Sequence, residues 1–275
     1  MTSLVIGTGD HVYRAVHPFG RLPDGAPLGN TSHVATDSSD RVYVYRRQDP
    51  PVLVFDGEGD LLTTWGDGLL IDAHGICITP DDSVFLVDRD AHEVLKFDAE
   101  RNVLLRLGAR ERPSLGAPFN HPADVAVDSN GEIFVADGYG NSSVHRFTAG
   151  GELIKTWGVR GTGPGEFTTP HGICLDGRGR VYVCDRENNR VQVFTVDGDY
   201  ITEWGDFYHP MRVFMDAQGI FYVTDQIPRI TMLNSEGELV TRGRTPFGGH
   251  GMWVDSKGNI YLASNADGIT KLVKQ

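Results

Sequence analysis

The amino-acid sequence predicts an all-β fold, a six-bladed β-propeller. Three observations support this prediction. One unit recurs six times along the 275 residues, each copy contains short segments of alternating apolar and polar residues, and turns rich in glycine, aspartate and asparagine separate these segments. Short strands with period-two alternation, in repeats of about 40 to 50 residues, are typical of propeller blades.

The first half of each repeat is its most regular part. It consists of an apolar strand, a turn and a second apolar strand, as in HGICLDGRGRVYVCD. The intervals between successive copies are 42, 49, 48, 40 and 39 residues, and the copies begin at Ser32, His74, Ala123, His171, Met211 and His250.

The second half of each repeat adds two further strands. A third strand follows a polar turn, as in NRVQVF, and a fourth ends near a Trp-Gly pair, as in LIKTWG and YITEWG. Valine, isoleucine, phenylalanine and tyrosine occupy the strand positions, as expected for antiparallel sheets. We therefore predict four antiparallel strands in each repeat, which is one propeller blade.

The two ends of the chain predict how the ring closes. The last repeat ends at ITKLVKQ, one strand short, and the N-terminal segment HVYRAVHPFGRLPDG belongs to no repeat. We expect a strand at about residues 10–22 to complete the last blade, because this pairing removes an exposed sheet edge. Residues 1–275 would then form a single six-bladed domain.

Composition excludes several classes of partner. The formal net charge is −12, and an acidic chain has little to attract nucleic acid or an anionic membrane. The N-terminus has no basic region followed by an apolar core, and nowhere do eighteen apolar residues follow one another. Cys77, Cys174 and Cys184 lie within strand patterns and form no CxxC pair. We expect a cytoplasmic protein, a monomer, whose partner is a small molecule.

Three histidines share one position of the repeat. In a propeller the first strand of each blade is innermost, so its entrance faces the central channel. His74, His171 and His250 occupy this entrance in blades two, four and six, and a closed ring brings them together. Three neutral imidazoles are a typical zinc ligand set that leaves a fourth position open, as in catalytic sites, and the same ligands also suit iron, manganese or cobalt. The alternative is that these residues only form hydrogen bonds within the channel wall.

A second column of the repeat is rich in arginine. The residues that follow the second strands include Arg47, Arg89 and Arg186, and a guanidinium suits bidentate binding of a carboxylate. We include Arg47 and Arg186 in the predicted site and leave Arg89 out. Tyr139 lies one step beyond this column in DGYGNS, where a nearby cation and arginine would favour its phenolate and make it a general base. Met211, at the channel entrance of blade five, is expected to contact substrate.

The repeats resemble NHL repeats, and the chain is similar to the catalytic core of peptidylglycine α-hydroxyglycine α-amidating lyase. The segments that carry this resemblance are AHGICITPDDSVFLVDRDAHEVLKFD, HPADVAVDSNGEIFVADGYGNSSVHRF, TPHGICLDGRGRVYVCDRENNRVQVF and GGHGMWVDSKGNIYLAS. The resemblance implies a channel zinc on His74, His171 and His250. It also implies that Tyr139 is the base, that Arg186 and Arg47 are substrate partners, and that an N-acyl-α-hydroxyglycine is cleaved to an amide and glyoxylate.

Two differences from that family change what we expect of the metal ions and of the substrate. Gly251 stands where the lyase has an aspartate that helps to hold a structural calcium ion, so calcium is not expected here. Gly140 replaces a cysteine of the lyase, and the loop disulfides of the family are missing. We therefore expect a smaller substrate with an α-hydroxy amide or α-hydroxy acid group.

Two other functions remain open at this point. The first is a metal-dependent hydrolase, similar to a lactonase or an amidase, in which a water molecule would be the nucleophile. No carboxylate base aligns with the channel in the repeats, which favours the lyase with Tyr139 as base. The second is a non-catalytic NHL propeller that binds other proteins.

Overall fold

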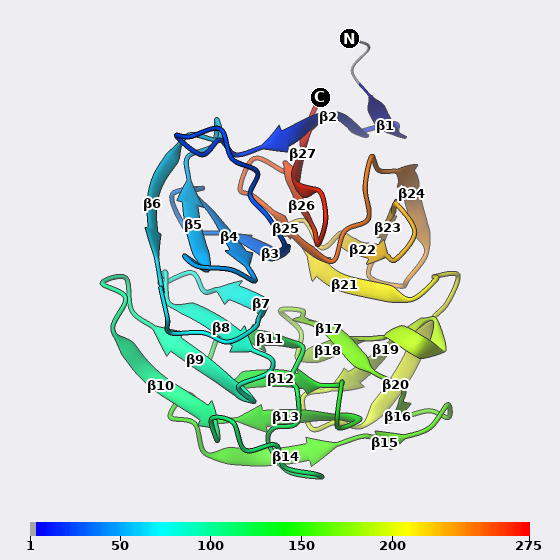
Figure 1. The fold of residues 1–275 in the computed structure, drawn as a ribbon. Helices are drawn as coiled ribbons and strands as arrows, with labels where there is room; N and C mark the ends of the chain where they lie inside the picture. The colour runs from blue at the N-terminus through cyan, green and yellow to red at the C-terminus, as the bar shows by residue number, and fades with distance from the viewer. Residues whose placement is uncertain (1–3) are drawn as a thin grey trace.

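A computed structural model describes residues 4–275 as six antiparallel sheets arranged in a ring. Figure 1 looks approximately along the axis of this ring, with the first strand of each blade near the centre. Five sheets have four strands in sequence order, and the sixth has five. The six-bladed propeller predicted from the repeats is confirmed.

The strand boundaries follow the repeat. The innermost strands are β3 (Thr31–Thr36), β7 (Ala73–Ile78), β11 (Asp124–Val127), β17 (Pro170–Leu175), β21 (Pro210–Met215) and β25 (Gly251–Val254). The second strands are β4 (Val42–Arg46), β8 (Val84–Asp88), β12 (Ile133–Asp137), β18 (Arg180–Asp185), β22 (Phe221–Asp225) and β26 (Ile260–Ser264). The third strands are β5 (Val52–Phe55), β9 (Glu93–Phe97), β13 (Ser143–Phe147), β19 (Arg190–Thr195), β23 (Arg229–Leu233) and β27 (Gly268–Lys274).

The outer strands complete the blades. They are β6 (Leu61–Trp65), β10 (Val103–Gly108), β14 (Leu153–Trp157), β20 (Tyr200–Trp204), β24 (Leu239–Arg244) and β2 (His11–Phe19). Four short elements of the described residues lie outside this pattern: β1 (Val5–Thr8), the parallel pair β15 (Val159–Arg160) and β16 (Glu166–Phe167), and the 3-10 helix η1 (Arg186–Asn188).

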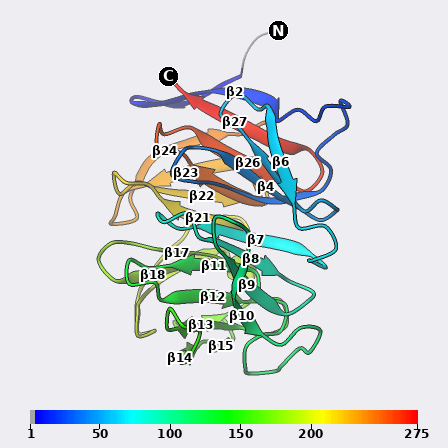
Figure 2. The same cartoon turned by 90° about the vertical axis from the view of Figure 1, so that its left-hand side faces the viewer.

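The ring is closed by the N-terminal strand, as predicted. Strand β2 pairs antiparallel with β27, with Tyr13 opposite Lys274 and Arg14 opposite Val273. Figure 2 shows the two strands side by side at the top of the molecule. One strand was not predicted: β1 (Val5–Thr8) folds back on β2 as a fifth strand of this blade.

The hydrophobic core lies between neighbouring blades. Each pair of adjacent sheets packs its apolar side chains face to face, as in the cluster between blades four and five that contains Tyr182, Trp204 and Phe221. The rings of Tyr182 and Phe221 lie 4.4 Å apart between centroids. The strands are therefore buried on both faces, which fixes the positions of their ends around the channel.

The three cysteines of the chain are buried. Cys77, Cys174 and Cys184 are all free thiols. Burial raises the pKa of the Cys77 and Cys174 thiols to about 12, so both stay protonated and unreactive at neutral pH.

Between residues 4 and 275, no helix has the length and apolar character needed to cross a membrane.

Candidate active site

Three imidazoles converge at the centre of the ring. His74 lies on β7, His171 on β17, and His250 directly before β25. The distances between ring centroids are 4.8 Å for His74 and His250, and 5.0 Å for each of the other two pairs. Potential ligand nitrogens of the three residues all lie within 4.8 Å of one another. The side chains are buried, with exposed fractions of 1%, 3% and 8%.

The intervening blades orient these imidazoles. The Nδ1 atom of each histidine lies close to the backbone carbonyl oxygen at the same repeat position of the next blade. The pairs are His74 with Ala123 at 2.6 Å, His171 with Met211 at 2.7 Å, and His250 with Ser32 at 2.8 Å. A carbonyl oxygen only accepts hydrogen bonds, so Nδ1 carries the proton in each ring. The Nε2 lone pair is therefore available in each ring, the arrangement found in metal-binding histidines.

The glycine after each histidine permits this contact. A Cβ atom at these glycines would lie 2.6 to 2.8 Å from the same carbonyl oxygens, in the pairs Gly75 with Ala123, Gly172 with Met211 and Gly251 with Ser32. Such distances are too short for a real side chain, so only glycine allows the next blade to approach. The His-Gly pairs of the sequence thus reflect the packing of the innermost strands.

The electrostatic environment keeps the three imidazoles neutral. Burial lowers the pKa of His74 and His171 well below the usual range, and it lowers the pKa of His250 to about 4. The neighbouring histidines lower the pKa of His74 and His171 further, because one imidazolium would repel another. Three neutral, buried nitrogen donors with fixed tautomers fit a zinc ion.

Tyr139 covers the open side of the histidine cluster. Its hydroxyl oxygen lies 2.9 Å from Nε2 of His74, 3.0 Å from Nε2 of His171 and 3.2 Å from Nη1 of Arg186. Two flanking glycines let its loop pack closely against neighbouring segments. A Cβ at Gly138 would lie 1.9 Å from the Pro170 carbonyl oxygen, and one at Gly140 would overlap the side chain of Asn120.

Two arginines flank the ring of Tyr139. The guanidinium carbon of Arg186 lies 5.1 Å from the ring centroid, and that of Arg89 lies 5.2 Å from it. Both distances fall within the range of cation–π attraction. The sequence interpretation left Arg89 out of the site, whereas the structure brings it into contact with the predicted base.

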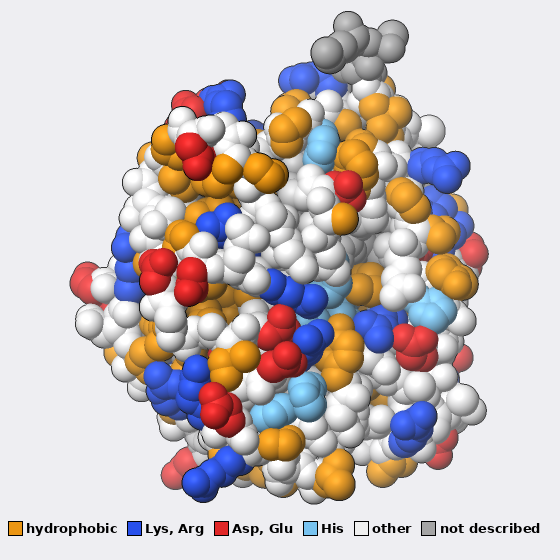
Figure 3. Space-filling view, viewed as in Figure 1, with side chains coloured by type: hydrophobic (Ala, Val, Ile, Leu, Met, Phe, Trp, Pro, Cys, Tyr) orange, Lys and Arg blue, Asp and Glu red, His pale blue; other side chains and the backbone are white. Residues whose placement is uncertain are grey.

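Arg47 lies at the same end of the central channel as Tyr139, which we call the mouth, but it has a different partner. Its Nε atom donates to the Ala73 carbonyl oxygen at 3.2 Å and lies 3.4 Å from Asp72. Asp72 also forms an ion pair with Arg89 at 3.0 Å. Burial raises the pKa of Asp72, and the two arginines oppose that effect. Asp72 occupies neither the repeat position of the histidines nor that of the arginines, so its place at the mouth was not predicted. Figure 3 shows the face of the propeller that is turned to the viewer in Figure 1, and basic, acidic and histidine side chains gather around its middle.

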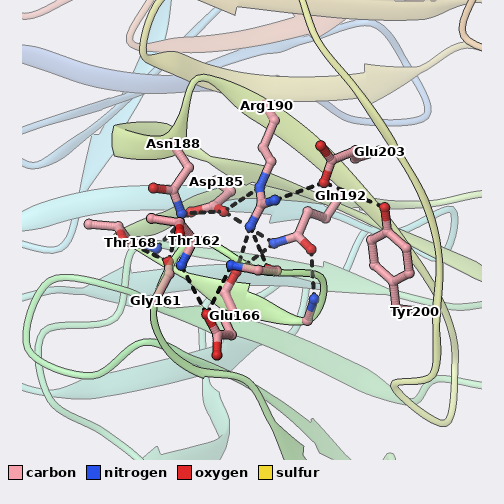
Figure 4. A network of polar contacts seen from close by, with 12 residues as sticks. Gly161, Thr162, Glu166, Thr168, Asp185, Asn188, Arg190, Gln192, Tyr200 and Glu203 are labelled. Atoms are coloured by element: carbon pink, nitrogen blue, oxygen red, sulfur yellow. Dashed lines mark hydrogen bonds and ion pairs between the residues drawn. The ribbon is translucent and has the colours of Figure 1, made fainter.

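A network of polar contacts around Asp185 (Figure 4) supports the turn of blade four in which Arg186 lies. Asp185, at the end of β18, accepts hydrogen bonds from the Thr168 backbone at 2.7 Å, from Asn188 at 2.8 Å and from Arg190 at 2.9 Å. These contacts fix both ends of the turn η1, whose first residue is Arg186. The Arg186 side chain is held further by Glu187, at 2.8 Å from its Nε atom.

A buried ion pair joins blades three and five. Arg212 of blade five donates to the Asp124 carboxylate of blade three and to the Ile173 carbonyl oxygen. Burial raises the pKa of Asp124 to about 6, and Arg212 opposes this shift. A Cβ at Gly251 would lie 2.6 Å from Cγ of His33, so no aspartate fits there.

A pocket adjoins the histidine cluster on one side. Its volume is about 230 Å³, and it is lined by residues of blades five and six that include His250, Met211, Gln226 and Asn265. Met211, the predicted substrate contact, thus lines this pocket while its carbonyl oxygen orients His171.

Comparison with known proteins places the chain in a family. The NHL repeat model matches residues 119–147 and 167–194. NHL repeat-containing protein 3 of Mus musculus is 32% identical over 241 residues, which cover 78% of this chain and 69% of the mouse protein. The probable peptidyl-α-hydroxyglycine α-amidating lyase of Caenorhabditis elegans is 36% identical over 149 residues, which cover 52% of this chain and 43% of the nematode protein.

The solved structures agree on the fold. A gluconolactonase from Xanthomonas campestris superimposes with a TM-score of 0.74 at 15% identity, covering 96% of this chain and 90% of that one. The fold and the repeats define an NHL-type β-propeller with a histidine-lined channel. This chain belongs to the NHL-repeat family, whose members similar to it include proteins named amidating lyases.

Proposed function

We propose that this chain is a zinc-dependent lyase that cleaves the C–N bond of a small α-hydroxy amide. The observation that carries the proposal is the contact of the Tyr139 hydroxyl with Nε2 of both His74 and His171. If Tyr139 acts as the general base, this contact means that it would act directly beside three imidazoles that can hold a metal ion. The relatives named amidating lyases support the same reaction class.

A zinc ion on His74, His171 and His250 would supply Lewis acidity toward the α-hydroxyl group of the substrate. Tyr139 removes the hydroxyl proton, and the resulting electron pair forms the carbonyl group of the product as the C–N bond breaks. The departing amide nitrogen receives one proton, so that Tyr139 can return what it removed. The substrate therefore divides into an amide and an aldehyde without consuming water.

Arginine side chains give the substrate its orientation. Arg186 contacts Tyr139 and has a charged group at the mouth, so it can bind a carboxylate attached to the reacting carbon. Arg47, which is paired with Asp72, is the second candidate for this carboxylate. For an N-acyl-α-hydroxyglycine, the aldehyde product is glyoxylate.

Metal content and glyoxylate release test the proposal together. The purified protein should contain about one zinc ion per chain and release glyoxylate from N-acetyl-α-hydroxyglycine. His171→Ala should lose both the metal and the activity. His121→Asn is the matched control, because His121 lies near the mouth outside the cluster and asparagine tolerates its left-handed backbone, with φ at 59°. Equal metal content in wild type and His171→Ala would refute the proposal.

A metal-dependent hydrolase is the second candidate. The similarity of the fold to a gluconolactonase favours it, since the same channel can accommodate a nucleophilic water molecule. Hydrolysis of a lactone by the zinc-loaded protein, with no glyoxylate release from any α-hydroxyglycine derivative, would select this function. The enzyme relatives argue against a propeller that only binds proteins.

A further inference from the structure

The pocket beside His250 has a different character from the rest of the mouth. It lies between blades five and six and is lined by Met211, Gln226, Gly248, Asn265 and His250. One end therefore reaches the histidine cluster, while the other opens to solvent between side chains that the proposed chemistry does not use.

The charges of the mouth are distributed unevenly around the channel. Arg47, Arg89 and Arg186 come from blades one, two and four, whereas no lysine or arginine lines the pocket. The one carboxylate that lines it, Asp225, is paired with Arg229. A substrate carboxylate is thus attracted to the arginine side and is not attracted to the pocket. The opposite end of the substrate, which carries no negative charge, is left to occupy the pocket.

The walls of the pocket are suited to a polar group. Gln226 and Asn265 are both exposed, so their amide groups are available to a ligand as donors and as acceptors. Ser264 adds a hydroxyl group to the same lining. Two aliphatic side chains, Met211 and Ala266, also line the pocket, so its lining is mixed, and the amide groups are what would favour a polar acyl group over an apolar one.

One wall of the pocket is a glycine. The pocket has a volume of about 230 Å³. Gly248 forms part of the wall, and a Cβ atom there would have a single neighbour within 4 Å, the Gln226 carbonyl oxygen at 3.4 Å. A larger side chain at this position would therefore extend into open space and reduce the volume.

From these observations we infer that the pocket beside His250 binds the acyl group of the substrate, and that this group is small, uncharged and polar, such as a carbamoyl group. The inference rests on the proposed lyase function for the orientation of the substrate. It adds the chemical class of the group on the nitrogen, which neither the fold nor the relatives specify.

A matched set of substrates tests the inference. N-carbamoyl-α-hydroxyglycine and N-acetyl-α-hydroxyglycine have similar shapes and differ by an amino group in place of a methyl group, while the N-benzoyl compound is larger and apolar. We expect kcat/KM to be about three- to tenfold higher for the carbamoyl than for the acetyl substrate, corresponding to one hydrogen bond between neutral groups. The benzoyl substrate should be the poorest. A preference for the benzoyl substrate would overturn the inference.

Variants of the wall separate polarity from size. Gln226→Leu combined with Asn265→Leu should bring the carbamoyl and acetyl substrates to within about twofold of each other, because the discriminating hydrogen bonds are lost. Gly248→Leu should lower kcat/KM for the acetyl and carbamoyl substrates and spare the smaller formyl substrate. Gly177→Leu, at an open turn with no atom within 4 Å of its Cβ position, is the matched control. An unchanged preference in the double variant would contradict the inference.

Direct binding distinguishes this inference from the proposed reaction. The amide products urea, acetamide and benzamide can be titrated against wild type and Gly248→Leu by ligand-observed NMR. We expect urea to bind most tightly, and its binding to weaken at least about tenfold in Gly248→Leu, a loss of about 1.4 kcal/mol. If no substrate is turned over and urea still binds in this manner, the lyase proposal fails and the pocket assignment stands. If glyoxylate is released and the product amides bind equally to both proteins, the pocket assignment fails alone.

Discussion

The hydroxyl oxygen of Tyr139 lies 2.9 Å from Nε2 of His74. Because Nδ1 carries the ring proton in both His74 and His171, either Nε2 atom can accept the single phenolic proton, and the Tyr139 oxygen lies 3.0 Å from Nε2 of His171. Without a metal ion, the predicted base thus forms a hydrogen bond with a potential metal ligand of a neighbouring blade. A substrate hydroxyl group bound between Tyr139 and the histidines would lie within reach both of the base and of a metal ion held there.

This relationship predicts the behaviour of Tyr139→Phe. The ring would still pack between Arg89 and Arg186, and the three histidines would be unchanged, so zinc content should stay near the wild-type value. Turnover should fall by about 10²- to 10⁴-fold, the usual contribution of a general base. Tyr208→Phe, an exposed tyrosine of a neighbouring loop, serves as control. Glyoxylate release at the wild-type rate would reject Tyr139 as the base while leaving the metal site intact.

Replacement of Arg186 should lower both the affinity for the substrate and the rate of the reaction. Its guanidinium contacts the Tyr139 hydroxyl and faces the mouth, so Arg186→Met removes both a carboxylate partner and a charge beside the base. Loss of one charge-assisted hydrogen bond is worth about 1.5 to 3 kcal/mol, or roughly 10- to 100-fold in kcat/KM. Arg47→Met should affect KM more than kcat, because Arg47 makes no contact with Tyr139 among the described residues. Steady-state kinetics of both variants with the same carboxylate substrate would reveal the difference.

The sequence predicted the blades and the histidines because both depend on periodicity. Alternation marks each strand, and His74, His171 and His250 stand at one repeat position, so a closed ring must bring them together. The carbonyl oxygens of Ser32, Ala123 and Met211 were not predicted, since a backbone acceptor has no signature in side-chain identity. The His-Gly pairs were the available signal, because a glycine that follows a functional residue on a strand indicates close approach of another backbone.

Other features of the site lie outside what a repeat pattern contains. Asp72 and the side-chain direction of Arg89 depend on the conformation of the segments between blades, which differ in length and composition from one blade to the next. The pairing of Arg212 with Asp124 joins two blades that are not adjacent in sequence. Strand β1 has four residues, too few for an alternation pattern to identify it.

The close approach of blade five to β17 makes Gly172 sensitive to substitution. A Cβ at this position would lie 2.6 Å from the Met211 carbonyl oxygen and 2.8 Å from Cα of Arg212, both of them backbone atoms. Gly172→Ala should therefore lower the free energy of unfolding by at least about 2 kcal/mol, as overpacking of a buried contact does. It should also weaken zinc binding, since the same displacement moves the acceptor of His171 Nδ1–H.

Gly177→Ala is the control for that prediction. Gly177 lies in the turn of the same blade, and a Cβ there would meet no atom within 4 Å. Its substitution should leave stability unchanged or raise it by a few tenths of a kcal/mol. Urea denaturation of the two variants, together with zinc analysis, would separate packing from general destabilisation. Equal midpoints for both variants would contradict the packing explanation of the His-Gly pairs.

The buried histidines predict how the stability of the metal-free protein depends on pH. The pKa of His250 is about 4 in the folded chain, against 6.5 for an unperturbed histidine. Between these values the unfolded state binds more protons than the folded state, so the free energy of unfolding falls as pH decreases from 6.5 toward 4. At pH 5 the contribution of His250 should be lower by about 2 kcal/mol than at pH 7.5. His74 and His171 act in the same direction, because burial lowers their pKa as well.

Replacing His250 with glutamine isolates this contribution. His250→Gln has no group that titrates in this range, so chelator-treated protein should lose less stability between pH 7.5 and pH 5 than the wild type does. The measurement is urea denaturation at both pH values in the presence of a chelator. His17→Gln is a comparison variant rather than a neutral control: burial lowers the pKa of His17 as well, so its replacement should act in the same direction and shows what a buried histidine on β2, outside the channel, contributes. If wild type and His250→Gln lose the same stability, the imidazole of His250 is not held neutral by burial, and the charge state assigned to the metal ligands is wrong.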